Sequence, residues 1–209
     1  MEPIRTCVLG TGLAGLTFHV PFILALPELF SLNAILERNP KTEGGKLHER
    51  FGVAVTIHTT LDDVLNDKEL ELIVIATPNE THYEFAKKSL EAGKHGKRRY
   101  RIHHPIQTSS FISHRRPVLV DKPVTTTVDQ AKELGQLAKS KNLILYAFQN
   151  RRWDSDFLAL RKLLSLTPSS PQYLGNVWEF ESRYISAFVT ETIAFHNLIS
   201  SGSIDIELL

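Results

Sequence analysis

The sequence is poor in cysteine, in net charge and in long apolar runs. Cys7 is the only cysteine among 209 residues, so no internal disulfide can form, and this usage is typical of a reducing compartment. A formal net charge of +1 gives no general attraction to nucleic acid or to acidic membranes. The apolar stretch from Leu13 to Leu26 is broken by His19 and Pro21 and is too short to span a bilayer. With no signal-peptide pattern at the start, we expect a cytoplasmic protein without a nucleic-acid or membrane partner.

Apolar runs of strand length alternate with helical patterns from Ile4 to about Phe148. We expect strands at Ile4–Leu9, Leu32–Glu37, Val53–His58, Leu70–Ala76, Val118–Val120 and Leu143–Phe148. We expect helices at Leu13–His19, Thr42–Phe51, Thr81–Ala92 and Val128–Lys141. Asn79 is the expected N-cap of the third helix, and Gly93 is expected to end it. The alternation predicts the α/β class, with six strands in a doubly wound parallel sheet.

A second, α+β domain is expected to begin after this sheet. A helix from Asp154 to Leu164 has Asp154 as its expected N-cap and carries an apolar stripe. A loop at residues 168–171 follows, and the alternating segment Tyr173–Tyr184 is expected to form a half-buried strand. The sequence therefore predicts a Rossmann domain over residues 1–150 and the truncated start of another domain over residues 151–209.

The clearest chemical motif directly follows the first expected strand. Gly10-Thr11-Gly12-Leu13-Ala14-Gly15 fits the pattern G-x-G-x-x-G and opens a helix. Gly10 permits the tight turn, Gly12 lets a pyrophosphate approach the backbone, and Gly15 allows close packing of the helix on the strand. Glu37 ends the second expected strand, where a carboxylate accepts hydrogen bonds from an adenosine ribose. This combination predicts a dinucleotide site, with Thr11 and Leu13 in the phosphate-binding turn.

The choice between NAD and NADP depends on Arg38. A guanidinium beside Glu37 can pair with a 2′-phosphate, which favours NADP. A solvated arginine at a strand end is the competing interpretation, so NAD stays open as the alternative cofactor.

Four segments together resemble the Gfo/Idh/MocA oxidoreductases, the family of glucose-fructose oxidoreductase and inositol dehydrogenase. They are GTGLAG at residues 10–15, ATPNETH at 76–82, EAGKH at 91–95 and VDKP at 120–123. The resemblance implies that Thr77, Pro78 and Asn79 flank the dinucleotide, with His82 close to them in a mainly structural role. It implies that Lys122 is the catalytic lysine near the nicotinamide ribose, preceded by Asp121 in place of the commoner glutamate. A sugar or polyol is the implied substrate.

Two segments depart from the family pattern. Residues 96–117 hold six of the 24 Lys and Arg and no Asp or Glu, and they separate two motifs that the family places side by side. We interpret them as translated intron, and a basic loop that binds RNA or an acidic partner is the alternative. Either interpretation predicts a disordered loop. We expect no metal site at His103, His104 or His114, which lack ligand companions.

The tail is the second departure. Residues 185–209 contain no D-x-x-x-H acid-base pair, and His196 and Asp205 do not replace it. We therefore expect a chain that binds nucleotide but is catalytically incomplete, and a non-catalytic NAD(P) sensor or interaction module is the alternative function. An incomplete sheet around Trp178 and Phe180 is expected to favour self-association.

Overall fold

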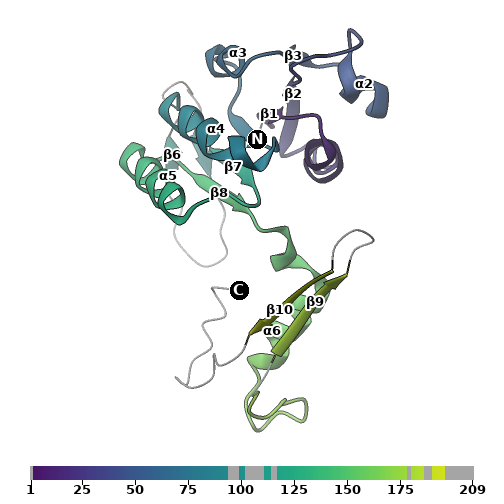
Figure 1. Cartoon of the computed structure of the whole chain (residues 1–209), viewed down its shortest axis with the longest axis vertical. Coiled ribbons are helices and arrows are strands. Elements are labelled where there is room, and N and C mark those ends of the chain that lie inside the picture. Colours follow the sequence, from purple (N-terminus) through teal and green to yellow (C-terminus); the bar gives the residue numbers. More distant parts are fainter. Residues whose placement is uncertain are drawn as a thin grey trace. The chain divides into compact units, whose positions relative to one another are not determined.

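Six parallel strands form the central sheet of the chain (Figure 1). The computed structural model describes residues 2–93, 99–101, 111–113, 117–177, 180–185 and 190–195. The sheet strands are β1 (Ile4–Leu9), β2 (Phe30–Leu36), β3 (Thr56–His58), β4 (Leu72–Ile75), β7 (Val118–Asp121) and β8 (Leu145–Phe148). Their order is β3-β2-β1-β4-β7-β8, and every pairing is parallel. The predicted doubly wound sheet is thus confirmed, and its order reverses between β1 and β4, where such sheets bind ligands.

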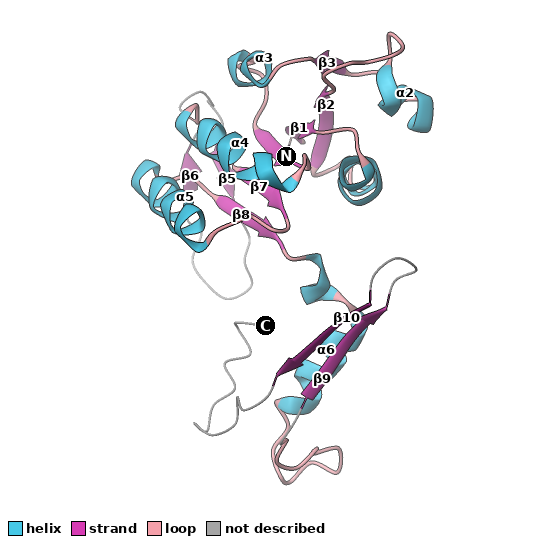
Figure 2. Cartoon of the chain, in the orientation of Figure 1, coloured by secondary structure: helices cyan, strands magenta, loops and turns pink. Residues whose placement is uncertain are grey.

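Helices cover both faces of this sheet (Figure 2). They are the π-helix η1 (Gly15–His19), α1 (Val20–Ala25), α2 (Gly45–Phe51), α3 (Leu61–Asn66), α4 (Asn79–Glu91) and α5 (Val128–Lys141). Cys7 and Leu9 of β1 face a core that α3, α4 and α5 complete, whereas Val8 faces a core shared with η1, α1 and α2. Alternate residues of one strand are therefore buried on opposite faces, which explains its continuous apolar sequence.

The first helical segment extends past the point where the sequence predicted its end. The N–H of Val20 donates to the carbonyl of Gly15, five residues earlier, so the chain makes a π turn. Pro21 then lies in the first turn of α1, where its missing N–H is not needed. The prediction that the helix ends at His19 was wrong because this wider turn accommodates the proline.

Helix α3 was not predicted. Its N-cap Thr60 accepts a hydrogen bond from the backbone N–H of Asp63, and the Asp63 carboxylate accepts one from the Thr60 N–H. This capping box fits a T-x-x-D signal in the sequence, which the short length of the helix obscured.

Of the two helix-end predictions for α4, the one for its start was wrong. Its N-cap is Pro78, and Asn79 is its first residue instead of the cap. Gly93 follows the C-cap Ala92 and so has the predicted C′ position, without the left-handed conformation that is common there. A side chain at Gly93 would place its Cβ 2.7 Å from the Leu143 side chain, so close packing is the requirement at this position.

A short antiparallel pair interrupts the segment that was expected to be a disordered loop. Strand β5 (Arg99–Arg101) pairs with β6 (Phe111–Ser113), which corrects that expectation for these six residues. The three histidines of the segment, His103, His104 and His114, lie outside the described residues.

The chain divides into two units, Met1–Gln149 and Asn150–Leu209. The second unit contains the 3₁₀-helix η2 (Asn150–Trp153), helix α6 (Ser155–Leu164), and strands β9 (Phe180–Ile185) and β10 (Thr190–Phe195), which pair antiparallel. The expected strand Tyr173–Tyr184 was wrong at its start, because residues 173–177 have no strand structure. Trp178, His196 and Asp205 lie outside the described residues.

Asp154 is the N-cap of α6, as predicted, but its side chain makes no capping hydrogen bond. Its carboxylate instead accepts one from Arg151 at 2.7 Å. In the described part of the chain, no helix combines the length and the apolar character that crossing a membrane requires.

Candidate nucleotide-binding site

The glycine turn after β1 has three distinct geometric requirements. Gly10 has φ of +101°, and a Cβ there would lie 2.6 Å from the carbonyl oxygen of Ala76. A Cβ at Gly15 would lie 2.0 Å from the carbonyl oxygen of Gly10. Gly12 has no atom within 4 Å of its Cβ position, so the space beside it is open. The turn is thus held tightly at both ends and leaves its middle free for a ligand.

A cavity of about 480 Å³ opens beside this turn, within the usual size range of small-molecule sites. The predicted residues that line it are Gly10, Thr11, Gly12, Leu13, Glu37, Arg38, Thr77 and Pro78. The sequence did not single out Ala14, Leu36, Asn39, Lys46, Ala76, Thr81 and Phe85, which also line it. Gly15, Asn79, His82, Asp121 and Lys122 are not among the lining residues.

The carboxylate of Glu37 lies at the β2 side of the cavity. The residue is 5% exposed, and its Oε2 accepts a hydrogen bond from the backbone N–H of Lys46 at 3.1 Å. Its Oε1 is buried and has no hydrogen-bond partner in the described part of the chain. A buried carboxylate oxygen without a donor is costly, so this atom requires a donor from a ligand or water.

Two cationic side chains line the same end of the cavity. Arg38 follows Glu37 directly, and Lys46 reaches the site from the start of α2. Both residues are exposed. The approach of Lys46 depends on Gly45, whose φ is +58° and whose Cβ would lie 2.6 Å from Glu37 Oε2. Since the turn at Gly45 brings Lys46 to the cavity only in the folded chain, no spacing in the sequence predicted this residue.

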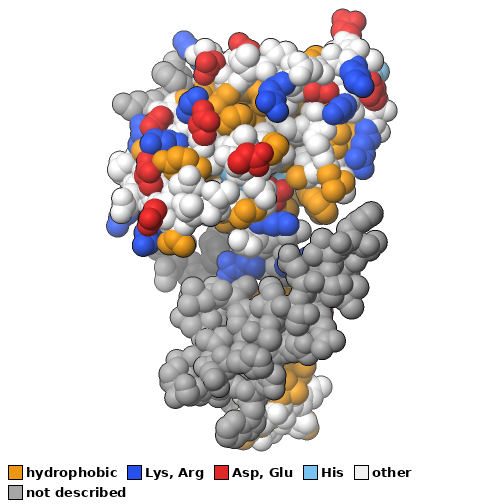
Figure 3. Space-filling model, viewed as in Figure 1, with side chains coloured by type: hydrophobic (Ala, Val, Ile, Leu, Met, Phe, Trp, Pro, Cys, Tyr) orange, Lys and Arg blue, Asp and Glu red, His pale blue; other side chains and the backbone are white. Residues whose placement is uncertain are grey.

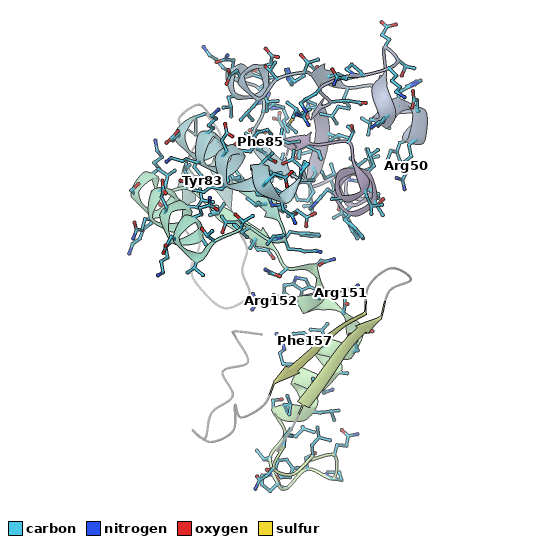
Figure 4. All side chains as sticks on the ribbon, viewed as in Figure 1. Arg50, Tyr83, Phe85, Arg151, Arg152 and Phe157 are labelled. Atoms are coloured by element: carbon cyan, nitrogen blue, oxygen red, sulfur yellow. The ribbon has the colours of Figure 1, made fainter. Side chains whose placement is uncertain are left out.

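The opposite wall of the cavity follows β4. The hydroxyl of Thr81 donates to that of Thr77 at 2.7 Å, so the first turn of α4 fixes the Thr77 side chain. Phe85 adds an apolar surface from the next turn of α4, and Figure 4 labels it there. On the face of the first unit that Figure 3 shows, Lys and Arg side chains are interspersed with Asp and Glu side chains. The two cations beside Glu37 are therefore a local feature.

Asp121 and Lys122 lie at the end of β7, the strand that neighbours β4. Lys122 is exposed, and its backbone N–H donates to Asp121 Oδ1 at 2.7 Å. Burial alone would raise the pKa of Asp121, but the His19 ring, the Lys122 N–H and nearby positive charge together lower it. His19 Nε2 lies 3.7 Å from Asp121 Oδ2, which is too far for a hydrogen bond, so the ring acts on this carboxylate through its charge when it is protonated.

Replacing Asp121 with asparagine should lower the free energy of unfolding at pH 7 by about 1 kcal/mol, because a charge-assisted contact is lost. A lowered pKa means that this stabilisation is present above the pKa of the unfolded chain and disappears as the pH falls through the folded value. Urea unfolding of both proteins at pH 7 and at about pH 3 measures it. A difference that stays the same at the two pH values would contradict the assignment.

The match to known proteins agrees with this geometry. The model of the family described as "Oxidoreductase family, NAD-binding Rossmann fold" matches residues 4–96 and 99–149. The chain therefore belongs to the Gfo/Idh/MocA oxidoreductases, as its motifs indicated.

The matches to individual relatives cover most of this chain but less than half of the relative's length. An uncharacterized oxidoreductase of Schizosaccharomyces pombe is 39% identical over 184 residues, which are 88% of this chain and 42% of the relative. The scyllo-inositol 2-dehydrogenase (NADP(+)) IolW of Bacillus subtilis is 31% identical over 165 residues, 79% of this chain and 38% of that protein. A solved oxidoreductase structure from Bacteroides fragilis is 38% identical with a TM-score of 0.60, and the match covers 78% of this chain and 42% of that one.

Proposed function

We propose that this chain binds a nicotinamide dinucleotide in the cavity between Gly12, Glu37 and Thr77. The observation that carries the proposal is the buried, unpartnered Oε1 of Glu37, a residue that lines the cavity, because a ribose hydroxyl can supply the donor that it lacks. The open space beside Gly12 accommodates a pyrophosphate, and the helical turns that begin there offer N–H groups to its charge. A bound nicotinamide supplies the hydride chemistry of the family. Titration with NADH and NADPH, followed by nicotinamide fluorescence, tests the proposal.

The cofactor that we propose is NADP, with NAD as the second ligand of the same site. Arg38 and Lys46 bring two positive charges to the end of the cavity where Glu37 faces the ribose. A 2′-phosphate there pairs with the guanidinium, which outweighs the repulsion from the single Glu37 carboxylate. The B. subtilis relative is named as an enzyme of NADP(+), which supports the same preference.

Replacing Arg38 with alanine should weaken NADPH binding roughly tenfold and change NADH binding by less than about twofold, because only NADPH carries the phosphate that the guanidinium contacts. Parallel fluorescence titrations give the ratio of the two dissociation constants. Arg50→Ala is the matched control, since Arg50 is an exposed arginine of α2 that does not line the cavity. An unchanged ratio in Arg38→Ala would remove the proposed phosphate contact.

We further propose that Lys122 orients a sugar or polyol for the hydride transfer of the family. An exposed ammonium at the carboxyl end of β7 can donate a hydrogen bond to the reacting oxygen and stabilise negative charge there. The name of the B. subtilis relative, a scyllo-inositol 2-dehydrogenase, supports a polyol as the substrate class.

Among the described residues that line the cavity, the titratable ones are Glu37, Arg38 and Lys46, all on the β2 side. We therefore propose nucleotide binding, without turnover, for these 209 residues, and we propose the role of Lys122 for a chain of the family that also supplies a proton acceptor.

A further inference from the structure

The ring of His82 connects two loops that follow neighbouring strands. His82 is 1% exposed in the first turns of α4. Its Nε2 lies 2.8 Å from the carbonyl oxygen of Thr77, and its Nδ1 lies 2.6 Å from the carbonyl oxygen of Pro123, 41 residues further along the chain. Thr77 lines the cavity after β4, and Pro123 directly follows Lys122 after β7. One buried ring therefore holds the cavity wall and the loop of the proposed active-site lysine.

Each ring nitrogen of His82 faces a backbone carbonyl oxygen. A carbonyl oxygen only accepts hydrogen bonds, so a neutral ring, with one N–H, donates to one of the two carbonyls, and only a protonated ring donates to both. An imidazole nitrogen on each side of a flat, rigid ring fixes the separation of the two carbonyls as well as their orientation. A side chain that packs only by shape would not need a ring nitrogen within hydrogen-bond distance of a carbonyl oxygen on each side.

The order of the strands in the sheet determines which part of a bound dinucleotide lies beside the two loops that His82 connects. Glu37 and Arg38 follow β2, the Gly10–Gly12 turn follows β1, Thr77 follows β4, and Lys122 follows β7. A dinucleotide lying along this edge, with its ribose on Glu37 and its pyrophosphate on the glycine turn, has its nicotinamide half beside the β4 and β7 loops. ADP, which lacks that half, occupies only the β2 and β1 portion.

We propose that His82 is a positioning residue that holds the Thr77 and Lys122 loops at the separation required by the nicotinamide half of the ligand. The inference rests on the proposed dinucleotide site and goes beyond it, because it assigns a ligand-dependent role to a residue that does not line the cavity. It follows that His82 contributes to the binding of NADH and not to the binding of ADP.

The test compares His82→Gln with the unaltered chain. Glutamine keeps a polar side chain of similar length but cannot reach both carbonyls from opposite sides of a rigid ring. The dissociation constant of NADH should rise roughly tenfold, the loss expected for one or two hydrogen bonds, while that of ADP changes by less than about twofold. Ser89→Ala is the control for a change inside α4, since its buried hydroxyl has no hydrogen-bond partner in the described part of the chain. It should leave both constants unchanged.

A second measurement on the unaltered chain covers the case in which His82→Gln does not fold. The ring resonances of His82 in a proton–nitrogen correlation spectrum should shift on addition of NADH and stay in place with ADP. Equal weakening of NADH and ADP in the variant, or ring resonances indifferent to NADH, would overturn the positioning role. A wild-type chain that binds neither ligand would overturn the proposed function itself, and this inference with it.

Discussion

Replacing Gly12 with valine should raise the dissociation constant of NADPH on the order of 100-fold and leave the melting temperature of the protein unchanged. No atom lies within 4 Å of the Cβ position of Gly12, so the added Cβ meets nothing in the ligand-free protein. The side chain instead fills the space at the middle of the glycine turn, where the proposed pyrophosphate lies against the backbone. Fluorescence titration measures the first effect, and thermal unfolding followed by circular dichroism measures the second.

The titration and the thermal unfolding of Gly12→Val together distinguish exclusion of the ligand from misfolding of the protein. A variant that melts normally and still binds NADPH as the wild type does would show that the ligand does not approach the turn. A variant that melts well below the wild type would show that Gly12 has a packing role that its open surroundings do not indicate.

The same substitution at Gly15 should have the opposite consequence, a loss of stability of about 3 kcal/mol or more. A Cβ there would lie 2.0 Å from the carbonyl oxygen of Gly10, and backbone atoms on both sides leave little freedom to move apart. Relief requires η1 to shift away from β1, which opens the core that Leu16 and Val20 fill. Urea unfolding of Gly15→Val against wild type measures the loss.

Gly135→Ala provides the matched glycine control for the stability measurements. Gly135 lies inside α5 with no atom within 4 Å of its Cβ position. Since glycine is unfavourable in a helix interior, alanine should stabilise the protein by roughly 0.5–1 kcal/mol. A Gly15→Val protein as stable as wild type would show that η1 can lie further from β1 than the structure has it.

Most of the sheet could be predicted because its strands are buried on both faces. Continuous apolar runs such as that around Val74 leave little choice of structure, and the glycine turn marks where β1 ends. Boundaries were less predictable: β2 begins at Phe30, before the expected Leu32, and β3 is shorter than its apolar run. A strand ends where its neighbour stops offering hydrogen bonds, which is a property of the pair and not of one sequence.

The candidate site was predictable only where one local motif supplied it. The G-x-G-x-x-G turn and Glu37 carry their geometry in the sequence, and both line the cavity. Lys46 joins them through the left-handed turn at Gly45, and Phe85 through the packing of α4, so neither had a local signal. The resemblance implied a mainly structural role for His82, and its contact with Pro123, 41 residues away, had no local signal in the sequence.

Titration of the unaltered, folded chain with NADPH tests the central claim most directly. The nicotinamide fluorescence should change with saturation at micromolar concentration, and the signal should be lost in Gly12→Val protein of equal melting temperature. Binding of this kind would establish the cavity beside Gly12, Glu37 and Thr77 as a dinucleotide site. A folded wild-type chain that changes neither the fluorescence of NADPH nor that of NADH would contradict the account.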